Sequence, residues 1–225
     1  MSFNIGFLIF PNLTQLDFTG PYEVLARVPG ASLHVAAKTL EPVTSDSGLR
    51  ILPTVTLAEC PQLDVIVVPG GPSVDDWYGD AEIMEFLRTQ GAKAKYITSV
   101  CTGSLILGAA GLLDGYNATT HWSAMDNLAS FGAIPAEGRV VRDRNRFTGG
   151  GVTAGIDFAL SVAAELAGEQ VAKAIQLGLE YNPAPPFKGG HPSVAEPELV
   201  EAVTALMADR LDRRRQAAGR HALAS

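Results

Sequence analysis

The sequence predicts an α/β fold in which a mainly parallel β-sheet is flanked by helices on both faces. Short apolar, β-branched runs alternate along the chain with longer segments of helical periodicity. The runs at 4–10 (NIGFLIF) and 63–68 (LDVIVV) are almost continuously apolar, which is typical of strands buried on both faces. No repeat or internal linker interrupts this alternation. We therefore expect a single domain over residues 1–225, with a tail that frays from about residue 215.

The first half of the chain supplies four of the expected strands. The strand at 4–10 ends at Pro11-Asn12, and residues 13–20 are predicted to form a loop before a helix with Pro21 in its first turn. The later expected elements are a strand at 32–37, a hairpin or edge strand at 43–52 around the turn signal Asp46-Ser47-Gly48, the strand at 63–68 closed by Pro69-Gly70-Gly71-Pro72, and an amphipathic helix at 80–90.

The second half alternates in the same way. Alternating charged and β-branched residues at 139–147 favour a solvent-facing hairpin. The other expected elements are a strand at 96–100, a helix from about 123 to 131, helices at 158–166 and 169–179, a Pro- and Gly-rich loop at 182–192, and a terminal amphipathic helix at 198–214 whose basic run Arg213-Arg214-Arg215 complements the helix dipole.

Cys101 is the candidate nucleophile, because it lies where the strand at 96–100 turns into an apolar helix. Such a junction is a sharp turn that holds the side chain at its apex clear of the sheet, the geometry of a nucleophile elbow. Ser99 and Gly103 are small enough to allow so tight a turn. The N-terminus of the following helix favours a thiolate over a thiol. A free cysteine is more commonly a buried structural residue, and we assign Cys60, which has no such junction, to that class.

Asp17 is the candidate general acid or base. It lies between Leu16 and Phe18 after the carboxyl end of the first strand, where open α/β sheets build their sites. Apolar neighbours would desolvate the carboxyl and raise its pKa toward that of a general acid. The alternative is an N-cap of the following helix. Glu23 falls inside that helix and is the weaker candidate.

A second glycine-rich junction between a strand and a helix lies at 148–157 (TGGGVTAGID). It lacks the lysine of a phosphate loop and the spacing of a dinucleotide fingerprint, so its glycines are expected to let the backbone pass close to the elbow. His121 could orient or deprotonate a nucleophile, or it could hydrogen-bond the start of the next helix. His191 lies in the loop at 182–192 and is expected to be solvated.

Composition narrows the class of protein. The chain is 47% hydrophobic and 18% charged, so a sizeable core is expected. Its net charge of -7 disfavours nucleic-acid binding. Its two cysteines argue against a disulfide framework and fit a reducing cytoplasm. We expect no signal peptide and no membrane-spanning helix, since neither pattern occurs in the sequence.

Three stretches of the sequence resemble the ThiJ/PfpI superfamily of class I glutamine amidotransferase-like proteins. They are the elbow at 99–103 (SVCTG), the turn at 69–71 (PGG) and the junction at 148–157. The similarity covers nearly the whole chain and implies a flavodoxin-like arrangement of the sheet. Within the superfamily, residues 16–21 (LDFTGP) together with 100–103 (VCTG) resemble the isocyanide hydratases most closely.

This resemblance implies a homodimeric lyase that hydrates a small isocyanide to an N-substituted formamide through a thioimidate on the cysteine. It implies no metal and no organic cofactor. Cys101 would be the nucleophile, Asp17 the acid/base carboxylate and Thr102 the neighbouring hydroxyl that assists. The residues expected to line the substrate pocket are Gly71, His121, Gly151 and Val152.

Other members of the superfamily leave alternatives open. A cofactor-free glyoxalase-like enzyme would use the same cysteine, and a peptidase would need a pair of Cys101 and His121. A small-molecule or oxidation sensor would exploit a reactive thiolate without turnover. Ser99 stands where amidotransferases carry glycine, which argues against glutaminase activity. An AraC-type regulator would need a helix-turn-helix region after the loop at 182–192, where we expect one long helix.

Overall fold

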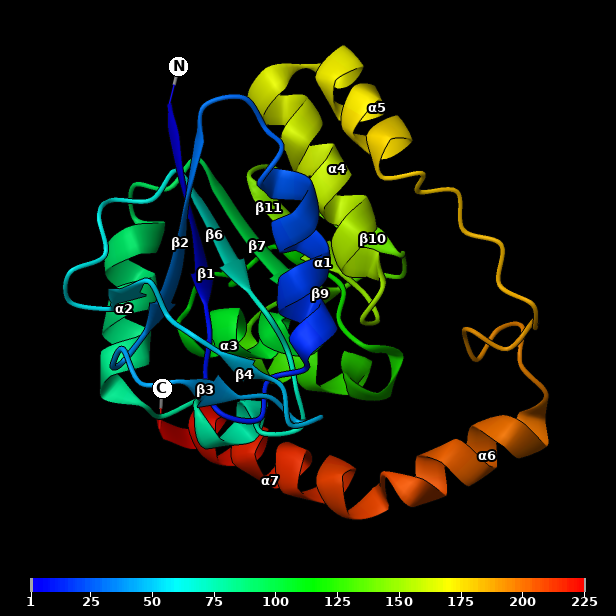
Figure 1. Ribbon diagram of the computed structural model, residues 1–225. Helices are drawn as coiled ribbons and strands as arrows, with labels where there is room; N and C mark the ends of the chain where they lie inside the picture. The colour runs from blue at the N-terminus through cyan, green and yellow to red at the C-terminus, as the bar shows by residue number, and fades with distance from the viewer. Residues whose placement is uncertain (1, 225) are drawn as a thin grey trace.

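The computed structural model describes residues 2–224 as an α/β fold around a seven-stranded sheet (Figure 1). The strand order is β10-β11-β7-β6-β1-β2-β5. Within the described residues, every neighbouring pair in this sheet is parallel except β10 and β11. The strands are β1 (Phe3–Leu8), β2 (Ala31–Ala37), β5 (Val55–Thr56), β6 (Val65–Val68), β7 (Tyr96–Val100), β10 (Val140–Asp143) and β11 (Arg146–Gly149). The predicted fold class is confirmed.

The remaining described strands form two small two-stranded sheets. β3 (Val43–Thr44) and β4 (Arg50–Ile51) form the hairpin predicted around Asp46-Ser47-Gly48, and β8 (Asn117–Ala118) pairs in parallel with β9 (Ile134–Pro135).

Helices cover both faces of the main sheet (Figure 1). The helices on one face are α1 (Gln15–Leu25), α4 (Ala154–Ala167) and α5 (Glu169–Gly178). Those on the other are α2 (Ala81–Gly91), α3 (Gly103–Ala109) and the 3-10 helix η2 (Trp122–Phe131). A short 3-10 helix, η1 (Val74–Asp76), and α6 (Pro197–Leu206) and α7 (Ala208–Ala224) complete the helices that the structure describes. None of the described helices is both long and apolar enough to cross a bilayer.

The core lies in the central strands. All four residues of β6 are fully buried, as are Phe7 on β1 and Ile97 on β7. Burial on both faces accounts for the continuous apolar runs of these strands, because neither face meets water. Their carboxyl ends, at the lower edge in Figure 1, are where α7 crosses the molecule.

Three predicted elements differ from the structure. The loop expected at 13–20 is wrong: α1 begins at Gln15, so Pro21 lies inside the helix. Proline removes one backbone hydrogen bond there, and α1 is held instead by buried side chains that include Phe18 and Val24. The terminal helix is two helices, α6 and α7, and α7 continues to Ala224 through the segment expected to fray.

The hairpin at 139–147 faces solvent on one strand only. β11 lies between β10 and β7, so all four of its residues are buried. Arg146 is 9% exposed, donates a hydrogen bond to the Leu112 carbonyl at 2.7 Å and stacks over the Tyr116 ring. β11 is buried because it pairs with a strand on each side, and the alternating sequence pattern at 139–147 does not reveal the second pairing.

Candidate active site

Cys101 occupies the tight turn between β7 and α3 that the sequence predicts. Its φ of 54° is in the left-handed region, which is uncommon for a residue with a Cβ. The conformation is held on both sides: the Cys101 amide donates to the Gly149 carbonyl at 3.0 Å, and the Cys101 carbonyl accepts from Thr120 Oγ1 at 2.9 Å. A Cβ at Gly103 would collide with the Val68 carbonyl oxygen, so the turn requires glycine there.

Asp17 lies in the first turn of α1 and is fully buried beside the elbow. The Gly70 amide donates to its Oδ2 at 2.9 Å, and the Thr14 amide donates to the Gly70 carbonyl at 2.9 Å. Its Oδ1 accepts no hydrogen bond from any residue that the structure describes. A Cβ at Gly70 would lie 2.6 Å from Thr102 Oγ1 and 3.0 Å from Asp17 Oδ2. The absence of a side chain at Gly70 therefore lets the Asp17 carboxyl and Thr102 approach the Pro69–Pro72 turn closely.

Burial is the main influence on the pKa values of the Asp17 carboxyl and the Cys101 thiol. It raises the pKa of Asp17 to about 7, against the opposing effects of the Gly70 amide and the Cys101 thiol. It also raises the pKa of Cys101 well above its usual value, and the nearby Asp17 carboxylate raises that pKa further. Thr102 opposes this through hydrogen bonds from its amide and hydroxyl. The expected thiolate is thus not the resting form, because loss of hydration outweighs the helix N-terminus.

Thr102 joins the elbow to the Pro69–Pro72 turn. Its hydroxyl oxygen accepts a hydrogen bond from the Gly71 amide at 3.1 Å, and the hydroxyl donates one to the Gly71 carbonyl oxygen at 3.2 Å. The structure therefore brings Cys101, Asp17, Thr102 and Gly71 together.

His121 and Gly151 adjoin each other near this cluster. A Cβ built on Gly151 would lie 3.8 Å from His121 Cδ2, and both Gly151 and Val152 are half-buried. His121 Nδ1 accepts from the Ser123 amide at 3.3 Å at the start of η2. Burial, together with the positive charges of Arg214 and Arg210, lowers the pKa of His121 to about 4. Among the described residues no hydrogen bond joins His121 to Cys101, which favours the helix-start role.

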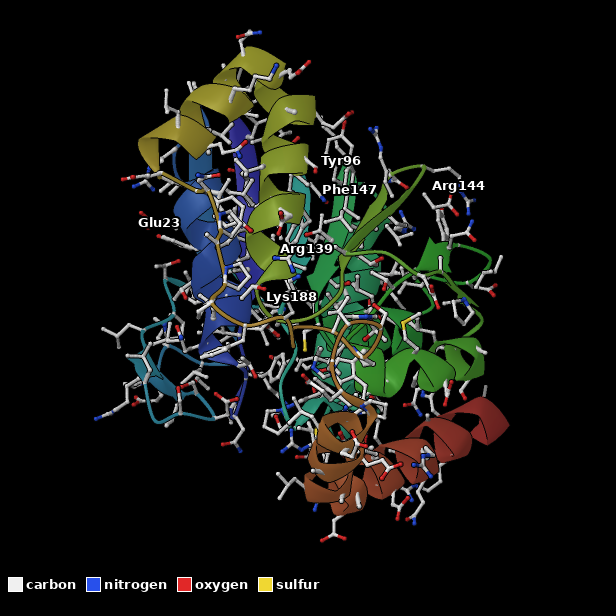
Figure 2. All side chains as sticks on the ribbon, turned by 90° about the vertical axis from the view of Figure 1, so that its right-hand side faces the viewer. Glu23, Tyr96, Arg139, Arg144, Phe147 and Lys188 are labelled. Atoms are coloured by element: carbon white, nitrogen blue, oxygen red, sulfur yellow. The ribbon has the colours of Figure 1, made fainter. Side chains whose placement is uncertain are left out.

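Two other acid/base candidates lie away from the elbow. Glu23 projects outward from α1 (Figure 2), and its exposed side chain pairs with Arg27 at 2.6 Å. His191 lies in an exposed loop, with Nδ1 2.9 Å from Ser193 Oγ. Cys60 is half-buried, and burial raises its pKa to about 11, as expected of a structural thiol. No group of three or more His, Cys, Asp or Glu side chains within residues 2–224 is arranged to hold a metal ion.

Sequence reasoning missed Arg214. The basic run at 213–215 was interpreted as a solvated complement to the helix dipole, but Arg214 is only 2% exposed and reaches the Gly71 carbonyl. A signal was present: Leu211, Arg214 and Ala218 follow helical spacing, and all three are buried.

Residues 4–165, well over half of the chain, match the DJ-1/PfpI family. The chain belongs to this family. A curated relative, the isonitrile hydratase of Pseudomonas putida, is 56% identical over 201 residues, which cover 89% of this chain and 88% of the relative.

Solved structures of the DJ-1/PfpI family share the fold. A ThiJ/PfpI family protein from Pseudomonas syringae has a TM-score of 0.95 at 49% identity, covering 97% of this chain and 91% of its own. DJ-1beta of Drosophila melanogaster has a TM-score of 0.73 at 28% identity, covering 80% of this chain and 98% of its own. The sheet of this chain therefore has the fold that these members of the family share.

Proposed function

We propose that this protein is an isocyanide hydratase, a lyase that adds water to an isocyanide (isonitrile) to give an N-substituted formamide. The 56% identity to the isonitrile hydratase of Pseudomonas putida over most of both chains carries the proposal. The cluster of Cys101, Asp17 and Thr102 supplies groups that suit this reaction, as the following steps describe.

The first step adds the thiol across the isocyanide carbon. That carbon is a weak electrophile that also accepts a proton, so attack by sulfur needs a proton donor at the same atom. Asp17, with a pKa of about 7, takes the proton of Cys101 and delivers it to the carbon as the carbon–sulfur bond forms. The product is a covalent thioimidate on Cys101. Asp17 Oδ1, which no described residue engages, is free to make this transfer.

The second step hydrolyses the thioimidate. Asp17, now ionised, removes a proton from water, and the hydroxide oxygen bonds to the thioimidate carbon. The substrate nitrogen takes up the remaining proton of the added water, from the new hydroxyl group, as the intermediate collapses. The carbon–sulfur bond breaks, the formamide leaves, and the proton on Asp17 returns to the sulfur. Thr102 steadies the sulfur through its hydroxyl and amide, both of which favour the thiolate. Gly71, His121, Gly151 and Val152 line the substrate pocket in this proposal.

Formamide production tests the proposal. Wild-type protein and Cys101→Ala are each incubated with a simple aryl or alkyl isocyanide, and the formamide is quantified by chromatography. We expect turnover from wild type and none from Cys101→Ala, whose fold is verified by circular dichroism. Cys60→Ala is the matched control and should retain activity, since Cys60 lies outside the cluster.

The same assay separates the alternatives. Loss of methylglyoxal that depends on Cys101, without formamide, would replace the hydratase with a glyoxalase-like enzyme. Formamide from Cys101→Ala at the wild-type rate would exclude the thioimidate. Oxidation of Cys101 by peroxide with no turnover of either substrate would favour a sensor.

We further propose that the protein acts as a homodimer, in a reducing cytoplasm that keeps both cysteines free. The support for a dimer comes from the segment 182–206, which swings wide of the body in Figure 1 and ends in α6, a helix with no buried residue. Large apolar side chains along it and on the adjoining α5 are uncovered, and a second copy would cover them. These side chains are Leu177, Phe187, Val194, Leu199 and Leu206.

A further inference from the structure

We propose that Arg214, which α7 carries to the carboxyl ends of the strands, is a positioning residue for the proposed hydration. By binding the Gly71 carbonyl, Arg214 leaves the hydroxyl hydrogen of Thr102 for the sulfur of Cys101. The inference deepens the proposed function, on which it rests, and assigns a role in the site to a helix that lies outside the family match at 4–165.

α7 is built to hold this arginine in place. Leu211, Arg214 and Ala218 form one buried stripe, at 7%, 2% and 1% exposure. Figure 1 shows α7 lying across the lower end of the sheet, and α7 packs against η2 and η1. The neighbouring Arg213 and Arg215 are exposed on the same helix, so burial selects one arginine of three.

The contacts of Arg214 point into the site. Its Nη2 donates to the Gly71 carbonyl oxygen at 3.4 Å, and its Nε lies 3.6 Å from Asp75 Oδ1, which is too far for a hydrogen bond. Within the described part of the chain, neither Nε nor this Asp75 oxygen therefore has a hydrogen-bond partner. Asp75 is the counter-ion of this buried guanidinium, and the positive charge of Arg214 still acts on both Cys101 and His121.

The role follows from counting hydrogens. The Thr102 hydroxyl has one hydrogen but two acceptors in reach, the Gly71 carbonyl oxygen at 3.2 Å and the Cys101 sulfur. Because Arg214 also donates to this carbonyl, the carbonyl oxygen keeps a partner when the hydroxyl turns to the sulfur, and the hydroxyl oxygen still accepts from the Gly71 amide. The thiolate then gains a donor at the moment when it forms.

The charged and titratable neighbours fit this assignment. Cys101 faces Asp17 from α1, and Arg214 acts on it from α7 with a positive charge that opposes the raised pKa of the thiol. Arg214 itself faces Asp75 and Tyr78, and the pKa of His121 is too low for a competing positive charge at neutral pH. Arg214 is thus the buried cation among these groups that can assist the thiolate.

The test measures the sulfur directly. Cys101 is alkylated with iodoacetamide across a pH series in a Cys60→Ser background. Intact-protein mass spectrometry measures the rate of alkylation at each pH. We expect Arg214→Met to raise the midpoint of the alkylation profile by about one pH unit and to lower kcat for formamide production about tenfold, with KM changed less than about twofold. Arg214→Lys should recover much of the shift, whereas the exposed control Arg213→Met should behave as wild type.

A double variant separates positioning from plain structural support. In a Thr102→Val background, which lacks the hydroxyl, Arg214→Met should move the midpoint by less than half of its shift in the Thr102 background. An equal shift in both backgrounds, or a fall in melting temperature with an unchanged midpoint, would overturn the proposal. Because alkylation needs no isocyanide, this readout decides the role of Arg214 even if the protein makes no formamide.

A third variant guards against misfolding of Arg214→Met. Asp75→Asn removes the counter-ion and keeps the arginine, so the midpoint should fall rather than rise. An unchanged or raised midpoint in a folded Asp75→Asn protein would count against the proposal.

Discussion

Asp17 lies inside the protein with one carboxyl oxygen held by the Gly70 amide, and none of the residues described here donates to the other. Burial favours its neutral form and raises its pKa from 3.8 to about 7. Between these two values the unfolded chain has released the proton and the folded chain has kept it. The unfolded state therefore binds fewer protons, and stability falls as pH rises through this window.

Asp17→Asn should remove this dependence. One pKa unit corresponds to about 1.4 kcal/mol, so ionising the native carboxyl costs on the order of 4 kcal/mol above pH 7. Asp17→Asn, which stays neutral, should be more stable than wild type at pH 8 by up to this amount, and nearly equal to it at pH 4. Urea midpoints at both pH values measure the gap. A gap that does not change with pH would contradict the raised pKa.

At the scale of elements, the elbow depends on how closely α3 approaches β6. The first residue of α3, Gly103, packs so closely that a Cβ there would meet the Val68 and Pro69 carbonyl oxygens. These are backbone atoms, which cannot move aside as a flexible side chain can. The small residues around the nucleophile are therefore a packing requirement between a helix and a strand as well as a requirement of the turn.

Gly103→Ala should destabilise the fold by about 1–3 kcal/mol, the usual cost of overpacking a core. The matched control is Gly219→Ala in α7, where a Cβ meets no atom of the described residues within 4 Å. That change should be neutral or stabilise by up to about 1 kcal/mol, because alanine favours the helix. Chemical denaturation compares the two variants. Equal stabilities for Gly103→Ala and wild type would mean that α3 can shift away from β6.

At the scale of the whole molecule, segment 182–206 stands out because its large apolar side chains are not covered by the rest of the chain. Ordered backbone with apolar side chains in water is unfavourable unless another surface covers it. Phe187, in the loop that precedes α6, and Leu206, the last residue of α6, are 83% and 85% exposed. A second copy of the chain is the partner that we propose.

Phe187→Glu/Leu206→Glu should convert a dimer into a monomer, because two charges cannot be buried unpaired in an apolar interface. Light scattering after size exclusion should give twice the chain mass for wild type and a single chain mass for the variant. Leu52→Glu serves as the control, since Leu52 is 67% exposed but lies far from this segment in the sequence. A monomeric wild type at micromolar concentration would refute the dimer.

The sequence alone predicted every strand of the main sheet except β5, the turn at Cys101, and Cys101 and Asp17 as candidate site residues. These features depend on neighbouring residues: an apolar run reports burial on two faces, and small residues beside Cys101 report a sharp turn. Asp17 was found because its apolar neighbours predict desolvation, although its helix was expected to start at Pro21 and starts at Gln15. The hairpin at 43–52 was likewise encoded by its own turn residues.

Only the tertiary structure decided which charges enter the site and which atom holds the proton. Arg214 reaches Gly71 across 143 residues of sequence. Its helical spacing with Leu211 and Ala218 marks it out from Arg213 and Arg215, but only the packing of α7 brings it to the Gly71 carbonyl. The helix N-terminus behind Cys101 predicted a thiolate, but burial among α1, the Pro69–Pro72 turn and α3 raised the pKa of the thiol instead. Desolvation depends on every element that surrounds a group, so local sequence determines the chemical groups and packing determines their charge.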